Sequence, residues 1–571
     1  MSAVTERPAV RWDDDYDLVV LGAGAAGLTA AAVGASAGLR TLLLEKTQHV
    51  GGTTARSGGA VWIPDSPQRA ALGIGADGAS ALRYLDELVG DRADRALREA
   101  FLAEGPRMLR YLEEHSEVRL DLAPDEPDYR QDVPGAALGG RALRAREYDG
   151  RRLGSDFERI AAPLPELMVL GSMMVTRAEV ARLLRLATSW DAWMLAARLV
   201  TRYLADRTRY SRGTRLVLGN ALIARLFATA RTRGVPIWFG AIPQELIVLD
   251  GGVAGLVAGH GETERRVRAR HGVVLAGGGF PASPELRRRF LPAPVAAHTP
   301  AYDACTGDTL LLAERAGAAI ATGSDNAFWF PSSVAKRRDG STAVFPHIVL
   351  DRAKPGLIAV DAAGRRFVDE AAPYHEFVRA MYRSDACVST IPALLVCDRR
   401  FLWRYGLGMI HPHTLDLRRF IGSGYLKRAA TLDDLAREIE VDPAGLNESV
   451  ARNNAFARSG VDEDFGKGSN AYDRSNGDPA HDPNPCLGAI EKPPYYAVAV
   501  WPTPLATSAG LRANACAQVL DRCGAPIPGL YACGSDMESP MGGEYPGPGA
   551  QIAAAMTFGY LAALHAARVP V

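Results

Sequence analysis

Short apolar runs alternate with glycine-rich turns near the start of this chain. The apolar run at residues 18–21 leads directly into the turn GAGAAG at residues 22–27, and an alanine-rich stretch follows. A second apolar run, at residues 41–44, ends on Glu45. This order predicts a strand, a tight turn, a helix and a second strand, which together form a dinucleotide-binding unit.

The glycines of this unit have separate expected roles. Gly22 makes the tight turn, Gly24 lets the backbone meet a pyrophosphate, and Gly27 packs the helix on the strand. Glu45 is placed to hold ribose hydroxyls. A second glycine-rich loop, GGTTARSGG at residues 51–59, follows the second strand. It suits a ligand whose pyrophosphate and ribityl chain run along the loop, and this favours FAD over NAD.

The pattern changes further along the chain. Charged residues alternate with Leu and Ala at helical spacing over residues 70–116, which predicts solvated helices. Residues 177–207 form a basic amphipathic helical region that we expect to pack on the body of the protein. The alternatives are contact with a membrane surface and delivery of an apolar substrate. Residues 237–257 predict a hairpin, and residues 272–280 predict a buried strand that runs into three glycines.

These elements predict an α/β protein with a Rossmann-like FAD-binding domain and an inserted α+β substrate domain. The expected boundaries are 1–283 for the first part of the FAD-binding domain, 284–497 for the substrate (catalytic) domain and 498–571 for the C-terminal part. A chain of 571 residues is too long for one simple core. We expect the chemistry at the cleft between the two domains.

Composition excludes several classes of protein. The 65 basic and 65 acidic residues cancel, so nothing suggests nucleic acid as a partner. The seven cysteines are scattered and contain no CxxC pair, so no metal site is expected and a reduced cytoplasmic compartment fits best. Residues 1–15 contain no apolar signal core, and no apolar run could span a bilayer. Membrane contact is therefore expected to be peripheral at most.

A turn rich in Gly and Pro, at residues 541–549, precedes a predicted helix that begins at Ala550. A helix start of this kind offers free N–H groups and the positive end of a dipole. It suits an anion, or a carbonyl that gains negative charge. Tyr545 is the ionisable side chain of the turn that has a proton to donate.

Three motifs make the chain resemble the 3-ketosteroid Δ1-dehydrogenase family, which belongs to the fumarate reductase-like FAD flavoproteins. They are GGTTARSGGAVWIP at residues 51–64, FVDEAAPY at residues 367–374 and MGGEYPGPG at residues 541–549. The resemblance covers essentially the whole chain. It implies non-covalently bound FAD and desaturation of the bond next to a ring ketone, with 1,2-desaturation of a 3-ketosteroid as the expected reaction.

The resemblance also implies the site residues. Tyr545 and the N–H of Gly549 would hold the ketone oxygen, Tyr374 would remove the α proton, and Tyr129 would be the partner of that base. Hydride would leave for FAD. The expected FAD contacts are Gly22, Gly24, Ala25, Ala26, Gly27, Glu45, Lys46, Gly52, Thr53, Thr54, Ser57, Gly58, Gly59, Ala60, Gly277, Gly278, Gly534, Asp536, Gln551 and Ile552.

Physical chemistry supports such a site. Loss of an α proton leaves an enolate, so donors aimed at its oxygen should contribute most. A phenol with a pKa of ~10 is a poor base near neutral pH and needs help from its neighbours.

Departures from the family pattern include two residues near the expected site. Ala509 stands where a Gly-Gly pair is usual, and Glu544 stands beside Tyr545 where we expect a small or neutral residue. Residues 506–509 also lack the histidine that fumarate reductases use, which disfavours a dicarboxylate substrate.

Three alternatives stay open. The first is desaturation or reduction of a non-steroid cyclic ketone. The second is a non-redox flavoprotein that acts as an isomerase or hydratase, and the third is a flavin-binding protein without turnover. For a dehydrogenase, the partners would be an apolar ring ketone and an electron acceptor that the sequence does not identify.

Overall fold

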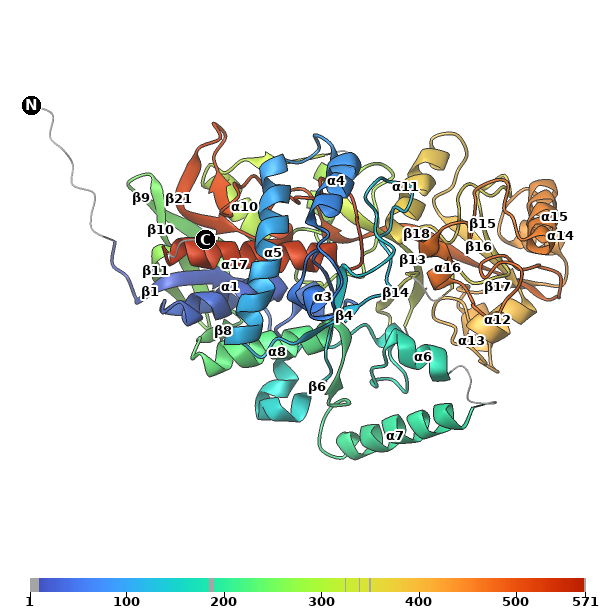
Figure 1. The fold of residues 1–571 in the computed structure, drawn as a ribbon, viewed down its shortest axis with the longest axis horizontal. Coiled ribbons are helices and arrows are strands. Elements are labelled where there is room, and N and C mark those ends of the chain that lie inside the picture. Colours follow the sequence, from blue (N-terminus) through green and yellow to red (C-terminus); the bar gives the residue numbers. More distant parts are fainter. Residues whose placement is uncertain (1–9, 184–188, 324, 338, 349–350, 569–571) are drawn as a thin grey trace, which may run out of the picture.

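Two β-sheets organise the part of the chain that carries the site. A computed structural model describes residues 10–183, 189–323, 325–337, 339–348 and 351–568 (Figure 1). In Figure 1 the first sheet, labelled β1, β11 and β21, lies on the left, and the second, labelled β13, β16 and β18, lies on the right.

The first sheet is the predicted nucleotide sheet. Its parallel core has the order β21-β11-β1-β2-β8, with β20 antiparallel at one edge and the β9–β10 hairpin branching from β11. Its strands are β1 (Asp14–Leu21), β2 (Thr41–Glu45), β8 (Ile237–Phe239), β9 (Ile242–Leu249), β10 (Gly252–His260), β11 (Thr263–Leu275), β20 (Gln518–Leu520) and β21 (Pro526–Ala532).

The register of this sheet brings three glycine turns together. Leu21 at the end of β1 pairs with Leu275 of β11, which also pairs with Ala532 of β21. A turn follows each of these strand ends, at residues 22–24, 277–279 and 534–536. Because parallel strands end at the same edge of a sheet, segments far apart in the sequence meet there.

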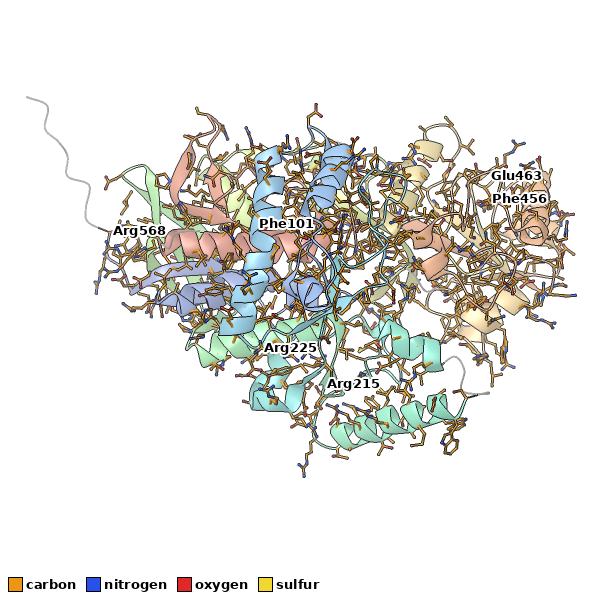
Figure 2. All side chains as sticks on the ribbon, viewed as in Figure 1. Phe101, Arg215, Arg225, Phe456, Glu463 and Arg568 are labelled. Atoms are coloured by element: carbon orange, nitrogen blue, oxygen red, sulfur yellow. The ribbon has the colours of Figure 1, made fainter. Side chains whose placement is uncertain are left out.

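Helices α1 (Ala25–Ser36) and α17 (Ala550–Ala566) pack against each other beside this sheet, and α17 also contacts α5 (Arg95–His115). Figure 1 shows α5 crossing in front of them. Both α1 and α17 are buried along most of their length. Their Ala-rich composition permits this close approach: a Cβ on Gly559 would lie 2.6 Å from the carbonyl oxygen of Ala26. On α5, Phe101 (Figure 2) stacks on Trp62 at 6.1 Å between ring centroids.

The second sheet has six strands in the order β14-β13-β18-β16-β15, with β17 paired to β18. Its strands are β13 (Ala327–Lys336), β14 (Thr342–Pro346), β15 (Leu357–Val360), β16 (Ala393–Asp398), β17 (Lys427–Ala429) and β18 (Tyr495–Thr507). β18 crosses the expected boundary at residue 497 and stays in this sheet as far as Thr507. Strand periodicity does not reveal which sheet a strand joins, and the domain boundaries stay a prediction.

The remaining elements connect and cover the two sheets. They are α2 (Gly52–Ala55), β3 (Ala60–Trp62), α3 (Pro67–Ala71), α4 (Gly78–Val89), β4 (Leu120–Ala123), β5 (Ala142–Ala145), β6 (Tyr148–Asp149), α6 (Arg177–Leu183), α7 (Trp190–Arg207), β7 (Arg215–Leu216), α8 (Leu218–Thr232), α9 (Pro284–Phe290), α10 (Asp308–Arg315), β12 (Ile320–Ala321), α11 (Tyr374–Asp385), α12 (Arg399–Tyr405), α13 (Arg418–Gly422), α14 (Leu432–Glu438), α15 (Pro443–Ser459), α16 (Ala471–Asn476) and β19 (Gly510–Leu511).

The basic amphipathic region forms α6 and α7, and residues 184–188 of the predicted helix lie outside the described residues. The two helices pack on each other through a small apolar cluster. On the outer side of α7, Trp190 is 76% exposed and Trp193 is 59% exposed. Among the described residues, no helix is both long and apolar enough to cross a bilayer, and no cluster of His, Cys, Asp or Glu could hold a metal ion.

Candidate active site

A single cavity of about 890 Å³ contains almost every predicted site residue. It begins at the glycine turns of the first sheet and continues to the aromatic side chains in front of the second. Of the predicted residues, two do not line it, Gly27 and Asp536. Those that line it are Gly22, Gly24, Ala25, Ala26, Glu45, Lys46, Gly52, Thr53, Thr54, Ser57, Gly58, Gly59, Ala60, Gly277, Gly278, Gly534, Gln551, Ile552, Tyr129, Tyr374, Tyr545 and Gly549.

The first glycine turn has the geometry of a cofactor cradle. Gly22 has φ +103°, and a Cβ at this position would overlap Ala276. A Cβ on Gly27 would overlap the carbonyl oxygen of Gly22, so Gly27 shapes the turn from outside the cavity. A Cβ on Gly24 would meet no protein atom within 4 Å. The space beside Gly24 is therefore open on the cavity side, where a pyrophosphate would lie.

Glu45 and Lys46 line the cavity but already have partners. The Glu45 carboxylate accepts hydrogen bonds from the backbone N–H groups of Ala23 and Thr47, both at 2.9 Å. Lys46 Nζ donates to Asp308 Oδ2 at 2.5 Å. Glu45 therefore holds the first glycine turn, and a ribose contact by its carboxylate stays a prediction.

Asp536 was expected to contact the cofactor, but its side chain is buried outside the cavity. Its two carboxylate oxygens accept hydrogen bonds from the N–H groups of Gly277 at 2.6 Å and Gly279 at 2.8 Å. Asp536, from the turn at residues 534–536, thus fixes the shape of the glycine turn at residues 277–279. The sequence could not show which way its side chain points.

The start of α17 completes the cradle. Gly549 precedes the helix with φ +85°, and a Cβ there would overlap the carbonyl oxygen of Ala60. Gln551 lines the cavity with a buried Nε2 that has no hydrogen-bond partner among the described residues. A buried donor of this kind needs an acceptor. The open glycine turn, the free helix start and this amide fit a bound FAD.

A cluster of aromatic hydroxyls lies at the other end of the cavity. The hydroxyls of Tyr129 and Tyr374 are 2.9 Å apart. The ring of Tyr545 lies 5.4 Å from that of Tyr129 and 5.3 Å from that of Tyr374. Among the described residues, the N–H of Gly549 has no main-chain acceptor, so it is available to a ligand. The structure thus brings the four expected residues to one cavity.

Tyr129 is held against the turn that carries Tyr545. Its backbone N–H donates to the carbonyl oxygen of Pro546 at 2.9 Å, and the hydroxyl of Tyr84 donates to the same oxygen at 2.8 Å. The neighbouring Asp128 is ion-paired with Arg141 at 2.6 Å. These contacts fix the polar loop before β5 in place, although its sequence gives no periodic signal.

Burial sets the protonation of these phenols. It raises the pKa of both Tyr129 and Tyr374 well above the usual tyrosine value, and the neighbouring phenols raise them further. Burial also raises the pKa of Tyr545. All three hydroxyls therefore carry their protons near neutral pH, which suits a donor and leaves a base dependent on pH.

Two segments contribute aromatic residues to the cluster that the sequence did not assign to the site. Tyr472 of α16 lines the cavity with its ring 5.0 Å from Tyr129, and no motif pointed to it. On β13, Phe328 and Phe330 line the cavity while Trp329 is buried between them. Strand alternation predicts such a division but not which face meets the cavity.

Glu544, which no motif explained, has a structural role. Its buried carboxylate pairs with Arg379 of α11 at 2.7 Å and with Arg92 at 3.0 Å. Helix α11 begins at Tyr374. The Glu544–Arg379 pair therefore ties the turn of Tyr545 to the helix of Tyr374. The second departure, Ala509, is buried and does not line the cavity.

A glycine cradle at the edge of a parallel sheet, opening onto an aromatic cavity, defines an FAD flavoprotein. The chain belongs to the FAD binding domain family, whose model matches residues 17–552. It is 36% identical over 566 residues to a 3-oxosteroid 1-dehydrogenase of Mycobacterium tuberculosis, which covers 97% of this chain and 98% of that one.

The chain is also similar to two further proteins. The chain is 36% identical over 559 residues to a 4-oxocyclohex-2-ene-1-carboxylate 5-dehydrogenase of Sinomonas cyclohexanicum, with 97% of this chain and 94% of that one covered. It also matches the crystal structure of a 3-ketosteroid delta1-dehydrogenase from Sterolibacterium denitrificans in complex with 1,4-androstadiene-3,17-dione. That match has a TM-score of 0.91 and 35% identity and covers 97% of this chain and 100% of the other.

These relatives confirm the resemblance, the fold class, FAD as the cofactor and FAD-dependent oxidoreduction as the activity. They give no support to the alternative of an isomerase or hydratase.

Proposed function

We propose that this oxidoreductase desaturates the carbon–carbon bond next to a ring ketone, and that 1,2-desaturation of a 3-ketosteroid is its reaction. The observation that carries the proposal is the meeting of Tyr129, Tyr374, Tyr545 and the Gly549 N–H in one cavity with the FAD cradle. The names of the relatives in Mycobacterium and Sterolibacterium support the steroid.

In this proposal Tyr545 and Gly549 bind the ketone. The Tyr545 hydroxyl and the Gly549 N–H donate to the carbonyl oxygen, which becomes more negative as the α proton leaves. The raised pKa of Tyr545 keeps its proton in place for that role. The start of α17 adds a positive dipole end on the same side.

Tyr374 removes the α proton, and Tyr129 supports it. The 2.9 Å hydrogen bond between their hydroxyls lets Tyr129 donate to the oxygen of Tyr374 when Tyr374 has lost its own proton. When bound, FAD supplies the two-electron acceptor for the hydrogen that leaves the β carbon. The aromatic walls around the cluster, Phe328 and Phe330 among them, exclude water and fit an apolar ring system.

A second candidate is the same desaturation of a smaller ring ketone. It is favoured by the equal 36% identity to the Sinomonas dehydrogenase, whose substrate is an oxocyclohexene carboxylate. The proposed tyrosine roles apply to both substrates, because they involve only the ketone, its α carbon and the adjacent β carbon.

Product identification tests the proposal. Anaerobic mixing of the FAD-loaded enzyme with a 3-keto-4-ene steroid should bleach the oxidised flavin band and give a product two hydrogens lighter, with a double bond between carbons 1 and 2. Bleaching by a cyclohexanone and not by the steroid would select the second candidate. No bleaching with either ketone would overturn both.

A further inference from the structure

One wall of the cavity carries two cations that the reaction above does not use. Arg177, at the start of α6, and Lys354 both line the cavity. Arg177 Nη2 donates to the carbonyl oxygen of Ser475 at 2.7 Å. Lys354 Nζ donates to the carbonyl oxygens of Asn476 at 2.8 Å and Gly477 at 2.7 Å. The two cations thus meet at the C-terminal end of α16.

Neither cation has a carboxylate partner among the described residues. The carboxylate of Glu126 raises the pKa of Arg177, and the carboxylate of Asp478 raises the pKa of Lys354. Glu126 is paired with Arg144 at 2.7 Å, and Asp478 is paired with Arg404 at 2.6 Å. Arginine has five N–H donors and lysine has three, so carbonyl contacts leave donors on both side chains for a ligand.

Partial loss of solvent disfavours the charged form of both side chains, although Arg177 keeps an exposed surface and Lys354 is half-buried. It lowers the pKa of Arg177, and it lowers the pKa of Lys354 to about 8. Arg177 and Arg404 lower the pKa of Lys354 further, whereas Asp478 and Cys486 oppose them. A carboxylate in contact with both cations would reverse these shifts, since an opposite charge favours the charged form.

The carbonyls that bind the cations lie about one helical turn along α16 from Tyr472. Tyr472, near the start of α16, contacts Tyr129, and the carbonyls that bind Arg177 and Lys354 follow at the end of the same helix. At ~1.5 Å of rise per residue, that distance along the helix is about 5–6 Å. Apolar residues line the cavity near α6, namely Leu164, Leu167, Met168, Met174, Val175 and Val180.

Helix α6 is itself held in place. Arg215, labelled in Figure 2, pairs with Glu179 of α6 at 2.7 Å and with Glu147 at 2.6 Å. Arg177 is exposed, but the helix that carries it is therefore anchored.

We infer that Arg177 and Lys354 form an anion subsite for a carboxylate on the ring-ketone substrate, with the ketone bound at Tyr545 and the carboxylate bound at the end of α16. The inference rests on the ring-ketone reaction proposed above. An arginine can hold both carboxylate oxygens at once, and the adjacent ammonium completes the site. The carboxylate can belong to a small ring or to the side chain of a steroid, because both present the same charge to the subsite.

Matched acid and ester substrates test the subsite. We would measure kcat/KM of the FAD-loaded enzyme, with an artificial electron acceptor, for 4-oxocyclohexanecarboxylate and its methyl ester. The second pair is a 3-keto-4-ene steroid with a side-chain carboxylate and its methyl ester. The acid should exceed its ester at least tenfold in one pair, and that pair identifies the source of the carboxylate. The advantage should fall as pH rises through about 8, where Lys354 loses its charge.

Variants locate the effect. Arg177→Gln and Lys354→Gln should each reduce the acid-to-ester ratio at least tenfold, mainly through KM of the acid, and Lys354→Arg should restore much of it. Arg182→Gln, an exposed arginine of α6 that does not line the cavity, is the control and should keep the ratio. Flavin absorbance and melting temperature would establish that each variant is folded.

Two outcomes would overturn the subsite: equal constants for acid and ester in both pairs, or equal losses for acid and ester in the Arg177 and Lys354 variants. The second result would make the two residues helix caps only. Calorimetric titration with the same ligands separates this failure from failure of the reaction. Binding of the acid that depends on Arg177, without flavin bleaching, would keep the subsite and overturn the ring-ketone desaturation.

Discussion

The cofactor cradle and the tyrosine cluster lie in one cavity but are built in opposite ways. The cradle consists of short, contiguous glycine turns at the ends of parallel strands. The cluster combines single tyrosines from four separate segments: the loop of Tyr129, α11 with Tyr374, α16 with Tyr472 and the turn of Tyr545. Small residues make room for the cofactor, whereas large polar rings surround the substrate.

Because of this difference, we expect that mutations can disrupt FAD binding and catalysis independently of each other. Loss of a tyrosine hydroxyl should spare FAD binding, and added bulk in the cradle should spare the tyrosines. The following experiments attempt to break or sharpen that separation.

A large effect is expected from Tyr545→Phe. Removing one donor to a developing oxyanion costs about 10²–10³-fold in rate. We therefore expect anaerobic flavin reduction by a 3-ketosteroid to slow by that factor, measured by stopped-flow absorbance. Flavin content should equal that of the native enzyme. Loss of flavin from this variant would mean that the tyrosine cluster also contributes to FAD binding, and would contradict the separation of the two regions.

The converse change is Gly24→Val. Its side chain would enter the open space beside Gly24, where no protein atom lies within 4 Å. Overpacking against the cofactor costs about 1–3 kcal/mol, or about 5–150-fold in affinity for FAD. Equilibrium titration of the apoprotein with FAD measures this loss. Gly75→Val is the matched control, because a Cβ on Gly75 also meets no atom within 4 Å and Gly75 does not line the cavity. If the Gly24 variant binds FAD with native affinity, Gly24 does not lie against the cofactor.

The pH dependence sharpens the role of the cluster. Burial raises the pKa of Tyr374 well above the usual value, so the fraction of enzyme with a deprotonated base increases with pH. Below that pKa, kcat/KM should rise about tenfold per pH unit. A steady-state profile between pH 6 and 9, taken with a neutral steroid, measures the slope. A flat profile would contradict a tyrosine base with a raised pKa.

The smallest effect is expected from Glu544→Gln, which weakens the link between the two proton-handling segments. Arg379 keeps its pairs with Asp325 at 2.5 Å and Glu376 at 3.0 Å, so we expect only partial loss. Loss of one charged partner costs about 1–3 kcal/mol of unfolding free energy. Denaturant titration should show this, and flavin reduction should slow less than in Tyr545→Phe. An unchanged free energy of unfolding would mean that the pair does not hold the turn.

The two regions were also unequally predictable from the sequence. Local spacing suffices for the cradle, because Gly22, Gly24 and Gly27 act within a few residues of one another. Even in the cradle, the sequence did not show in which direction a side chain points. Asp536 faces the glycine turn at residues 277–279 and not the cavity, because its carboxylate accepts hydrogen bonds from the N–H groups of that turn.

The cluster depended on tertiary structure. Tyr374 and Tyr545 were found by resemblance, but nothing in the sequence near Tyr472 indicates an aromatic contact with Tyr129. The partner of Glu544 is likewise 165 residues away, on α11. Contacts between distant segments carry no periodic signal, and these contacts build the substrate end of the cavity.

The most direct test of the central claim is the rate of anaerobic flavin reduction in Tyr374→Phe, mixed with a 3-ketosteroid in a single turnover. If Tyr374 removes the α proton, the rate should fall by about 10²–10⁴-fold, while the flavin spectrum and FAD content stay native. A rate equal to that of the native enzyme, with FAD fully bound, would contradict the proposed chemistry of the cluster.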